Sequence, residues 1–249
     1  MLNPGKTKGV FFDLFGTLFI YRDLKKAWNA WFEEFFELIR IENDISNDRF
    51  SEICSGFYSR PDPLSAGNGF TVYENRIIEF CNYHKLKCSE SNLKKIADRT
   101  VDGWQKFVIP DPAVSELLSE IGKTKKTALI SNFDHPRHIH KKLKENEWEK
   151  LFGTIVISGE VGVKKPDKRI FGFALDELEL NPEDVIFVGD SREDIEGAQA
   201  AGIFPVLIAR KDFSNNLQYG YNNGPEEDWF TGMKDIEIIE NLAELKKFL

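Results

Sequence analysis

Two carboxylates that follow an apolar run have the spacing needed to hold a divalent cation. The run VIFV (185–188) leads into GDSRED (189–194), so Asp190 and Asp194 stand four residues apart at a strand end and a helix start. Mg²⁺ prefers oxygen ligands and usually takes only one or two protein carboxylates. We therefore expect Asp190 to bind Mg²⁺ directly and Asp194 to support it from behind. Asp190 and Ser191 would also suit an ordinary helix cap.

A third carboxylate, Asp13, also follows an apolar run. It begins the segment DLFGTL (13–18) directly after VFF (10–12). Open α/β sheets bind ligands at the carboxyl ends of their strands, which is where Asp13 would lie. Gly16 permits a sharp turn there, and Thr17 offers a hydroxyl. Taken alone, the segment fits an ordinary turn as well as a nucleophile.

Two further segments could bind an anion. Ser131 and Asn132 follow the apolar run 127–130, and Lys165 lies in VKKPD (163–167). Taken singly, polar residues at strand ends are common in turns, and an exposed lysine is ordinary. All of these features follow predicted strands, so a parallel sheet would bring them to one edge. Together they favour a metal-assisted site for a phosphate.

The elements that must position these residues are short apolar strands alternating with amphipathic helices. This pattern predicts an α/β fold with a parallel, Rossmann-like sheet and right-handed crossovers. The predicted strands are 10–12, 127–130, 154–157, 185–188 and 205–208, and the predicted helices are 113–125, 136–150, 166–178 and 194–201.

The interval 19–109 breaks this alternation, because it contains helical segments only. They are 24–41, 48–58, 72–83 and 90–107, and the first is crowded with the aromatic residues Trp28, Trp31, Phe32, Phe35 and Phe36. We expect these aromatics to form the core of an inserted domain rather than to bind a ligand. The predicted division is a core domain of residues 1–18 and 110–249 and a helical cap of residues 19–109. Residues 212–234 are expected to form an irregular loop before a last strand and helix.

Composition restricts the partners and the compartment. With 33 basic and 41 acidic residues the formal charge is -8, and no dense basic run is present, so we expect no nucleic-acid partner. An anionic substrate then needs a local positive charge.

The three cysteines contain no C-x-x-C pair, which favours a reducing compartment. No apolar run is long enough for a membrane or a signal peptide, so we expect a cytoplasmic protein of undetermined oligomeric state.

Two of the motifs resemble those of a known family. GVKKPDxxIF (162–171) and GDSxxDIxGAxAAG (189–202) are similar to the third and fourth motifs of the haloacid dehalogenase superfamily. The resemblance spans residues 10–208. It implies a Rossmann-like core, a helical cap between the first and second motifs that selects the substrate, and Mg²⁺ as cofactor.

The resemblance also assigns roles to residues of this chain. It implies that a small phosphorylated metabolite is hydrolysed through an aspartyl-phosphate intermediate on Asp13. The implied phosphate-binding residues are Thr17, Ser131, Asn132 and Lys165, and the implied metal ligands are Asp13, the main-chain carbonyl of Phe15, and Asp190, with Asp194 behind them. Lys165 and Mg²⁺ would relieve the repulsion between a carboxylate and a phosphate dianion.

Phe15 departs from the phosphatase pattern. Family phosphatases usually have a second aspartate at this position, which protonates the leaving group and later activates water. A phenyl ring cannot transfer a proton, and losing such help typically costs about 10² to 10⁴ in rate. Alkyl phosphates with poor leaving groups should therefore be slow substrates.

Two alternatives follow from Phe15. The family's 2-haloacid dehalogenases also lack an acid here, because a halide leaves without a proton, and they need no metal. They generally replace the Gly-Asp-Ser motif, whereas this chain keeps Asp190 and Asp194.

The other alternative is a phosphate-ligand or protein-binding module with vestigial catalysis. A cytosolic subgroup of the family has no second aspartate in its first motif and Ser-Asn-Phe-Asp in its second, which residues 131–134 match.

Three histidines lie together at His135, His138 and His140. Their spacing does not place all three on one helical face, which argues against a zinc site. We interpret them as a partly exposed helix start. A further hypothesis is that His135 lines the site and replaces the missing proton donor.

Overall fold

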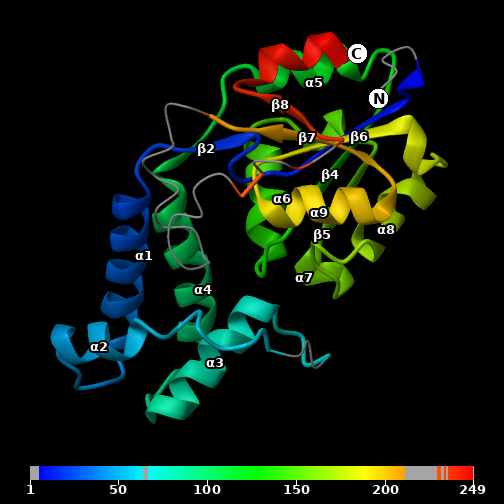
Figure 1. Cartoon of the computed structure of the whole chain (residues 1–249). Coiled ribbons are helices and arrows are strands. Elements are labelled where there is room, and N and C mark those ends of the chain that lie inside the picture. Colours follow the sequence, from blue (N-terminus) through cyan, green and yellow to red (C-terminus); the bar gives the residue numbers. More distant parts are fainter. Residues whose placement is uncertain (1–5, 64–66, 211–228, 231–232, 234, 249) are drawn as a thin grey trace. The chain divides into compact units, whose positions relative to one another are not determined.

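The computed structural model describes residues 6–63, 67–210, 229–230, 233 and 235–248 (Figure 1). The chain divides into two compact units. The sheet unit comprises Met1–Arg22, Val108–Phe133 and His140–Leu249, and the helical unit comprises Asp23–Phe107 and Asp134–Ile139. The predicted loop 212–234 lies outside the described residues except at positions 229, 230 and 233. Among the described residues, no helix combines the length and apolar character needed to cross a membrane.

The sheet unit contains six parallel strands in the order β5-β4-β1-β6-β7-β8. They are β1 (Gly9–Phe12), β4 (Lys126–Ser131), β5 (Thr154–Ile157), β6 (Val185–Gly189), β7 (Phe204–Ile208) and β8 (Glu237–Ile239). Every residue of β1 and β6 is buried, as expected for central strands covered on both faces. The predicted α/β fold with a parallel sheet is therefore confirmed.

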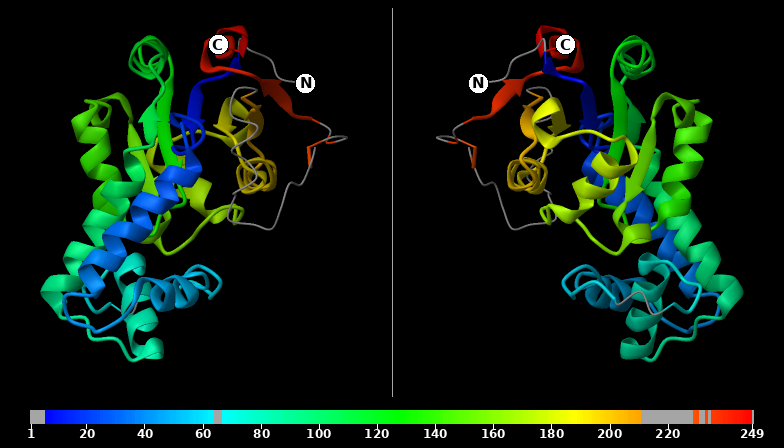
Figure 2. Two further views of the ribbon diagram at one scale, coloured as in Figure 1. Left: turned by 90° about the vertical axis from the view of Figure 1, so that its left-hand side faces the viewer. Right: turned by 90° about the vertical axis from the view of Figure 1, so that its right-hand side faces the viewer.

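Helices flank both faces of this sheet (Figure 2). They are α5 (Val114–Ile121), α6 (Pro136–Glu145), α7 (Ser158–Val161), α8 (Arg169–Glu177), α9 (Arg192–Ala201) and the 3-10 segments η2 (Glu149–Leu151), η3 (Pro182–Asp184) and η5 (Leu242–Phe248). On one face, α8 and α9 share an apolar core with β1, β4 and β6 that includes Phe11, Phe171 and Phe187. On the other side, α5 contacts β4 and η5 (Figure 1).

A two-stranded antiparallel ribbon carries the chain between the units. Strand β2 (Phe19–Tyr21) pairs with β3 (Val108–Pro110), so that Tyr21 lies opposite Val108. Because this pairing holds the ribbon in the sheet unit, the division falls at residues 22/23 and 107/108. The predicted borders were 18/19 and 109/110. Strands of three residues are too short to produce a periodic pattern, so the sequence did not reveal them.

Among the described residues of the insertion, four helices lie close to the predicted ranges: α1 (Leu24–Ile39), α2 (Asn47–Cys54), α3 (Val72–His84) and α4 (Glu90–Gln105). Each begins after a polar residue whose side chain accepts a hydrogen bond from the first turn: Asp23, Ser46, Thr71 and Ser89. Of the predicted aromatic core, Trp31 and Phe35 are buried. They pack against Phe57 and Phe50 from elsewhere in the same unit.

A second segment, Asp134–Ile139, also belongs to the helical unit. The Asp134 carbonyl accepts a hydrogen bond of 3.1 Å from the Tyr73 N–H, and the Arg137 guanidinium donates to the Glu74 carboxylate. No local pattern indicated this, since the segment follows β4 as the start of an ordinary crossover helix. It begins two residues after Asn132.

Candidate active site

The carboxyl ends of β1, β4 and β6 bring the predicted site residues of the sheet unit together. Strand β1 lies between β4 and β6, with Phe12 opposite Leu129 on one side and Val188 on the other. Asp13 continues β1, and its N–H donates to the Val188 carbonyl at 2.9 Å. Because neighbouring parallel strands end at the same edge, Asp13 lies beside the segments that follow β4 and β6.

Lys165 is the centre of the polar contacts at this edge. Its ammonium donates to Asp13 Oδ1 at 2.5 Å and to the Ile130 carbonyl at 2.9 Å, and its Nζ lies 2.6 Å from Asp194 Oδ1. The side chain is buried. All three N–H donors are therefore engaged with the protein, and contact with a phosphate would require exchanging one of these partners.

Asp13, Asp190 and Asp194 form a cluster in which one carboxylate oxygen from each lies within 4.8 Å of the others. Burial, with repulsion from Asp194, raises the pKa of Asp13 to about 7 despite the attraction of Lys165. Burial, Asp13 and Asp194 raise the pKa of Asp190 well above its ordinary value. Three carboxylates facing one ammonium carry an excess of negative charge, which a divalent cation would neutralise.

Lys165 responds to the same cluster in the opposite sense. Burial alone would lower the pKa of its ammonium, but the carboxylates of Asp13 and Asp194 outweigh burial and raise it. Lys165 is therefore a permanent cation at neutral pH. This is the local positive charge that an anionic substrate needs in a chain of net charge -8.

The side chain of Asp194 is used to build the loop after β6. Its Oδ2 accepts hydrogen bonds from the Asp190 N–H at 3.2 Å, the Ser191 N–H at 3.1 Å and the Ser191 hydroxyl at 2.8 Å. Ser191 in turn caps α9 by accepting from the Asp194 N–H. Asp194 is buried and fully engaged, whereas Asp190 is only half-buried.

Gly16 is required by the close approach of Asp190. A Cβ at this position would lie 1.9 Å from Asp190 Oδ2, and the backbone has a φ of +90°. No side chain can occupy that space without displacing the carboxylate. The adjacent Thr17 is fully buried, and its hydroxyl has no hydrogen-bond partner in the part of the chain that the structure describes. Buried hydroxyls rarely remain unpaired, so Thr17 fits a site that receives a polar ligand.

Ser131 ends β4 and Asn132 follows it, but their side chains differ in availability. The Asn132 amide donates to the Lys165 carbonyl at 3.0 Å, and its oxygen accepts from the Lys165 N–H at 2.9 Å. This reciprocal pair fixes the backbone of Lys165 beside β4. Asn132 is therefore a positioning residue for the lysine. Ser131 is buried at the last position of the strand.

Phe15 packs within an aromatic group of the sheet unit. Its ring centroid lies 5.0 Å from that of Phe133 and 5.7 Å from that of Phe19, and the side chain is half-buried. The turn is closed by the Gly16 N–H, which donates to the Phe19 carbonyl at 2.7 Å. Phe15 thus brings apolar surface to the position where the phosphatase pattern has an acid.

Tyr21 is a residue near this site that the sequence did not identify. Burial, followed by the charges of Asp190, Asp13 and Asp194, raises the pKa of its phenol well above the ordinary value. The hydroxyl therefore stays protonated at neutral pH and lies in the field of all three carboxylates. Its position depends on the β2–β3 ribbon, so no local pattern could have indicated it.

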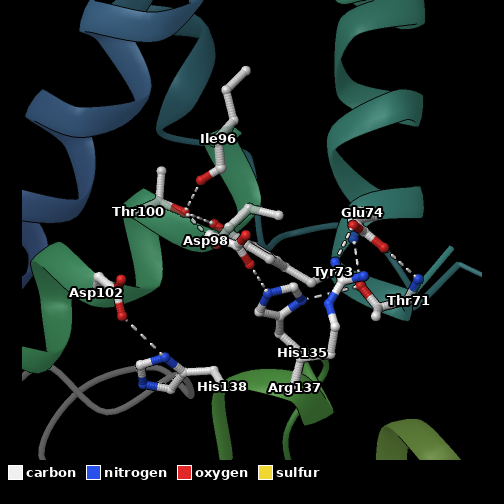
Figure 3. Close-up of polar contacts among 11 residues, drawn as sticks. Thr71, Tyr73, Glu74, Ile96, Asp98, Thr100, Asp102, His135, Arg137 and His138 are labelled. Carbon is white, nitrogen blue, oxygen red and sulfur yellow. Dashed lines mark hydrogen bonds and ion pairs between the residues drawn. The ribbon is translucent and has the colours of Figure 1, made fainter. Parts of the chain in front are cut away.

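The interpretation of the three histidines as a partly exposed helix start is wrong for two of them. His135 and His138 are buried, and His140 lies in the sheet unit. In the helical unit, His135 Nε2 lies 2.9 Å from Asp98 Oδ1 and its Nδ1 lies 3.2 Å from the Thr71 hydroxyl (Figure 3). Both ring nitrogens of His135 are thus engaged, which argues against its use as a proton donor.

His138 has its own pair of partners in the helical unit. Its Nε2 lies 2.8 Å from Gln105 Oε1, and its Nδ1 lies 3.5 Å from Asp102 Oδ1, the contact drawn in Figure 3. The two buried histidines therefore have separate acidic partners on α4. Such an arrangement anchors a segment rather than binding a metal with shared ligands.

Comparison with known proteins assigns the family. Residues 7–202 match the model of the haloacid dehalogenase-like hydrolases, so the chain belongs to that hydrolase family. The fold is similar to that of a haloacid dehalogenase family phosphatase from Thermococcus onnurineus, with a TM-score of 0.64 at 20% identity over 97% of each chain.

Curated relatives include both phosphatases and dehalogenases. The chain is 32% identical to the glyceraldehyde 3-phosphate phosphatase of Methanopyrus kandleri over 107 residues, 39% of this chain and 46% of that protein. It is 29% identical to (S)-2-haloacid dehalogenase 4A of Burkholderia cepacia over 120 residues, 47% of this chain and 51% of that protein. The match thus spans about half of each relative's length.

Proposed function

We propose that the protein is a Mg²⁺-dependent phosphatase that hydrolyses a small phosphorylated metabolite through an aspartyl-phosphate on Asp13. The observation that carries the proposal is the cluster of Asp13, Asp190 and Asp194 around Lys165. A metal-independent dehalogenase would have no need for three buried or half-buried carboxylates at one point. Phosphatases among the curated relatives add support.

The residues present fit a magnesium ion. The ligands would be the carboxylates of Asp13 and Asp190 and the main-chain carbonyl of Phe15, with Asp194 holding the Asp190 loop from behind. When bound, the ion supplies positive charge that favours ionised Asp13 and offsets the negative charge of a phosphate. The raised pKa values of Asp13 and Asp190 indicate how much negative charge this edge concentrates.

Asp13 is the proposed nucleophile because both its main chain and its carboxylate are held in place. Its N–H donates to the Val188 carbonyl of β6 at 2.9 Å, and its Oδ1 accepts from the Lys165 ammonium at 2.5 Å. Attack on phosphorus forms the bond from the Asp13 oxygen and releases the alcohol oxygen with its electron pair. Water then hydrolyses the aspartyl-phosphate, so one difficult displacement becomes two easier ones.

Phosphate oxygens would be held by Ser131, Thr17 and Lys165. The unpaired Thr17 hydroxyl supports its part in this set. Asn132 would contribute its main-chain N–H, since its side chain is committed to the Lys165 backbone. This is a change from the role that the sequence predicted for the Asn132 side chain.

The aromatic group around Phe15 restricts the substrate. No carboxyl group at position 15 can protonate the leaving oxygen, so the departing group must be a weak base or must carry its own proton source. We propose substrates with good leaving groups, such as acyl or aryl phosphates. We also propose that the helical unit acts as the cap that selects among them.

The test is turnover of p-nitrophenyl phosphate and acetyl phosphate with and without Mg²⁺, in wild type, Asp13→Asn and the exposed control Asp44→Asn. We expect Mg²⁺-dependent turnover that is lost in Asp13→Asn and retained in Asp44→Asn. Absence of Asp13-dependent turnover of both activated substrates would contradict the proposal.

Metal-independent dehalogenation of a 2-haloacid is the second candidate. Phe15 and the similarity to a haloacid dehalogenase favour it. Release of chloride from 2-chloropropionate that persists in EDTA would establish it, and no release from several haloacids would remove it. The third candidate, a binding module with vestigial catalysis, is excluded by any turnover that Asp13→Asn abolishes.

The proposed location is the cytoplasm. All three cysteines are free, and Cys54 and Cys81 are buried, which suits a reducing compartment. The proposed partner is a small anionic substrate, with neither nucleic acid nor membrane.

A further inference from the structure

A pocket of about 710 Å³ lies in the helical unit, apart from the residues assigned above. Its lining residues lie on α2 from Arg49 onward, in the turn that follows α2, and from Arg76 of α3 to Lys85 just beyond that helix. Every lining residue belongs to the helical unit. This volume is in the range of sites that bind small organic molecules.

The pocket has an apolar wall made of aromatic residues. Phe57 and Phe80 are buried and pack with ring centroids 5.3 Å apart. Tyr83 is exposed, and its ring lies 4.8 Å from that of His84. A ligand with an apolar body would find surface to cover here.

The pocket is also rich in cations. Its lining includes four permanent cations, which are Arg49, Arg60, Arg76 and Lys85, against the carboxylates of Glu52 and Glu79. Arg49 is paired with Glu52 at 2.5 Å. Arg60 and Lys85 have no carboxylate partner among the described residues. In a chain of net charge -8, a local excess of cations around a hollow is unusual.

Arg60 is held in an orientation suited to binding an anion. Its guanidinium carbon lies 3.7 Å from the centroid of the Tyr83 ring, so the two groups stack. Stacking fixes the plane of the guanidinium and leaves its N–H edge available for a carboxylate or phosphate. The ordered arginine would lose little entropy on binding.

Arg76 contributes a fixed positive charge to the wall of the pocket. It is 5% exposed, and it lines the pocket. Its terminal nitrogens donate to the Arg60 carbonyl at 3.1 Å and to the carboxylates of Asp62 and Asp134. Its Nε, however, is buried with no hydrogen-bond partner. The acceptors on its terminal nitrogens hold the guanidinium in place, so its charge stays beside the pocket.

We propose that this pocket is a second binding site, for a small organic anion that combines a phosphate or carboxylate with an apolar body. Arg60 and Lys85 would bind the anionic group, and Phe57, Phe80 and Tyr83 would contact the apolar part. The proposal does not depend on the reaction at Asp13. It predicts that binding occurs whether or not the protein is a phosphatase.

The test uses the full chain carrying Asp13→Asn, which prevents turnover of phosphate esters under the proposed function and leaves the pocket residues intact. The probes are AMP, citrate, inorganic phosphate and, as a neutral match to AMP, adenosine. Binding is followed by calorimetry and by the NMR signal of His84, assigned by its loss in His84→Gln. Burial lowers the pKa of His84, and the nearby charges of Arg60 and Arg49 lower it further, so a bound anion should raise it.

The pocket variant is Arg60→Gln/Lys85→Gln. Its matched control is Arg40→Gln/Lys87→Gln, which changes the net charge equally and also removes an arginine stacked on an aromatic ring, here Phe36. We expect AMP to shift the His84 signal at lower concentration than citrate or inorganic phosphate, which lack an apolar body, and adenosine not to shift it. The pocket variant should weaken binding at least about tenfold, and the control should not.

Three outcomes would overturn the proposal: no probe shifts His84 at about 10 mM, adenosine binds as well as AMP, or the two double variants bind alike. Stronger binding of AMP than of citrate and inorganic phosphate supports the contact with the apolar body. Turnover of p-nitrophenyl phosphate by Arg60→Gln/Lys85→Gln with Asp13 restored should match wild type. Loss of that turnover in an otherwise folded protein would place these residues in catalysis instead.

Discussion

Two groups of buried titratable residues in this protein differ in how their charges are balanced. At the edge of the sheet, Asp13, Asp190 and Asp194 share one ammonium, and the pKa values of Asp13 and Asp190 are raised. In the helical unit, His135 and His138 each have separate partners.

The difference distinguishes a reactive site from an anchoring one. A surplus of one charge in a buried cluster is stable only if something else neutralises it, which is the condition for binding a metal or an oppositely charged ligand. A histidine with both nitrogens engaged needs nothing further. A group of buried titratable side chains therefore indicates function here only where its charges do not cancel one another.

Among the variants that test this comparison, we expect Phe15→Asp to have the largest effect, on the rate of turnover. Restoring a carboxyl group two residues after Asp13 should raise turnover of an alkyl phosphate by about 10² to 10⁴, if the metal and phosphate groups are intact. Phe15→Asn is the control, because it removes the ring without supplying an acid. Steady-state kinetics with an alkyl and an aryl phosphate give the measurement. Equal activity of the two variants would contradict the account of Phe15.

Lys165→Met should have the largest effect on stability, because it leaves the carboxylates without their cation. Removing one partner of a buried ion pair typically costs about 3–5 kcal/mol in the free energy of unfolding. The control Lys8→Met removes an exposed pair with Asp184, which should cost about 0–1 kcal/mol. Denaturant unfolding gives both values, and Mg²⁺ should restore part of the loss in Lys165→Met only. Equal losses of stability in the two variants would contradict the view that the carboxylate cluster depends on Lys165.

Gly16→Ala tests whether the geometry of Asp190 matters. The new Cβ would fall 1.9 Å from Asp190 Oδ2, so the carboxylate must move, and activity should fall by about 10²-fold. Gly162→Ala is the matched control, because it also has a positive φ, +70°, with no atom within 4 Å of the added Cβ. Both variants should lose about 1–3 kcal/mol through backbone strain. A similar loss of activity in both would mean that strain, not Asp190, is responsible.

His135→Gln should produce the smallest effect, a loss of about 1 kcal/mol from its two buried contacts together with a changed pH dependence of stability. Burial lowers the pKa of His135, with Arg137 acting in the same direction and Asp98 and Glu74 opposing it. The folded protein therefore favours neutral His135, so stability is lost as the pH falls below about 6.5, where the unfolded chain takes up the proton.

Thermal unfolding between pH 7.5 and 5 measures this dependence. The wild type should lose up to about 1.4 kcal/mol more per pH unit than His135→Gln. The exposed control Asn47→Gln, which alters no titratable group, should keep the wild-type slope. An unchanged slope in His135→Gln would show that the buried histidine does not titrate as its surroundings require.

The residues that meet at the edge of the sheet could be predicted from the sequence, because each of them lies in a local motif. Asp13, Ser131 and Asp190 all follow short apolar runs, and parallel strands end at one edge, so their meeting follows from strand order alone. The four helices of the insertion were likewise evident from apolar periodicity and polar caps. Periodicity reports burial on each element, which the chain encodes within a few residues.

The tertiary structure alone determined which residues far apart in the chain contact one another. The β2–β3 ribbon brings Tyr21 into the field of the carboxylates, and the amide of Asn132 is committed to Lys165, 33 residues away. The segment after Asn132 joins the helical unit through His135 and Arg137. Sequence determined which groups are present and which element carries each. Whether a given donor is free or already engaged depends on long-range pairing, which no local pattern records.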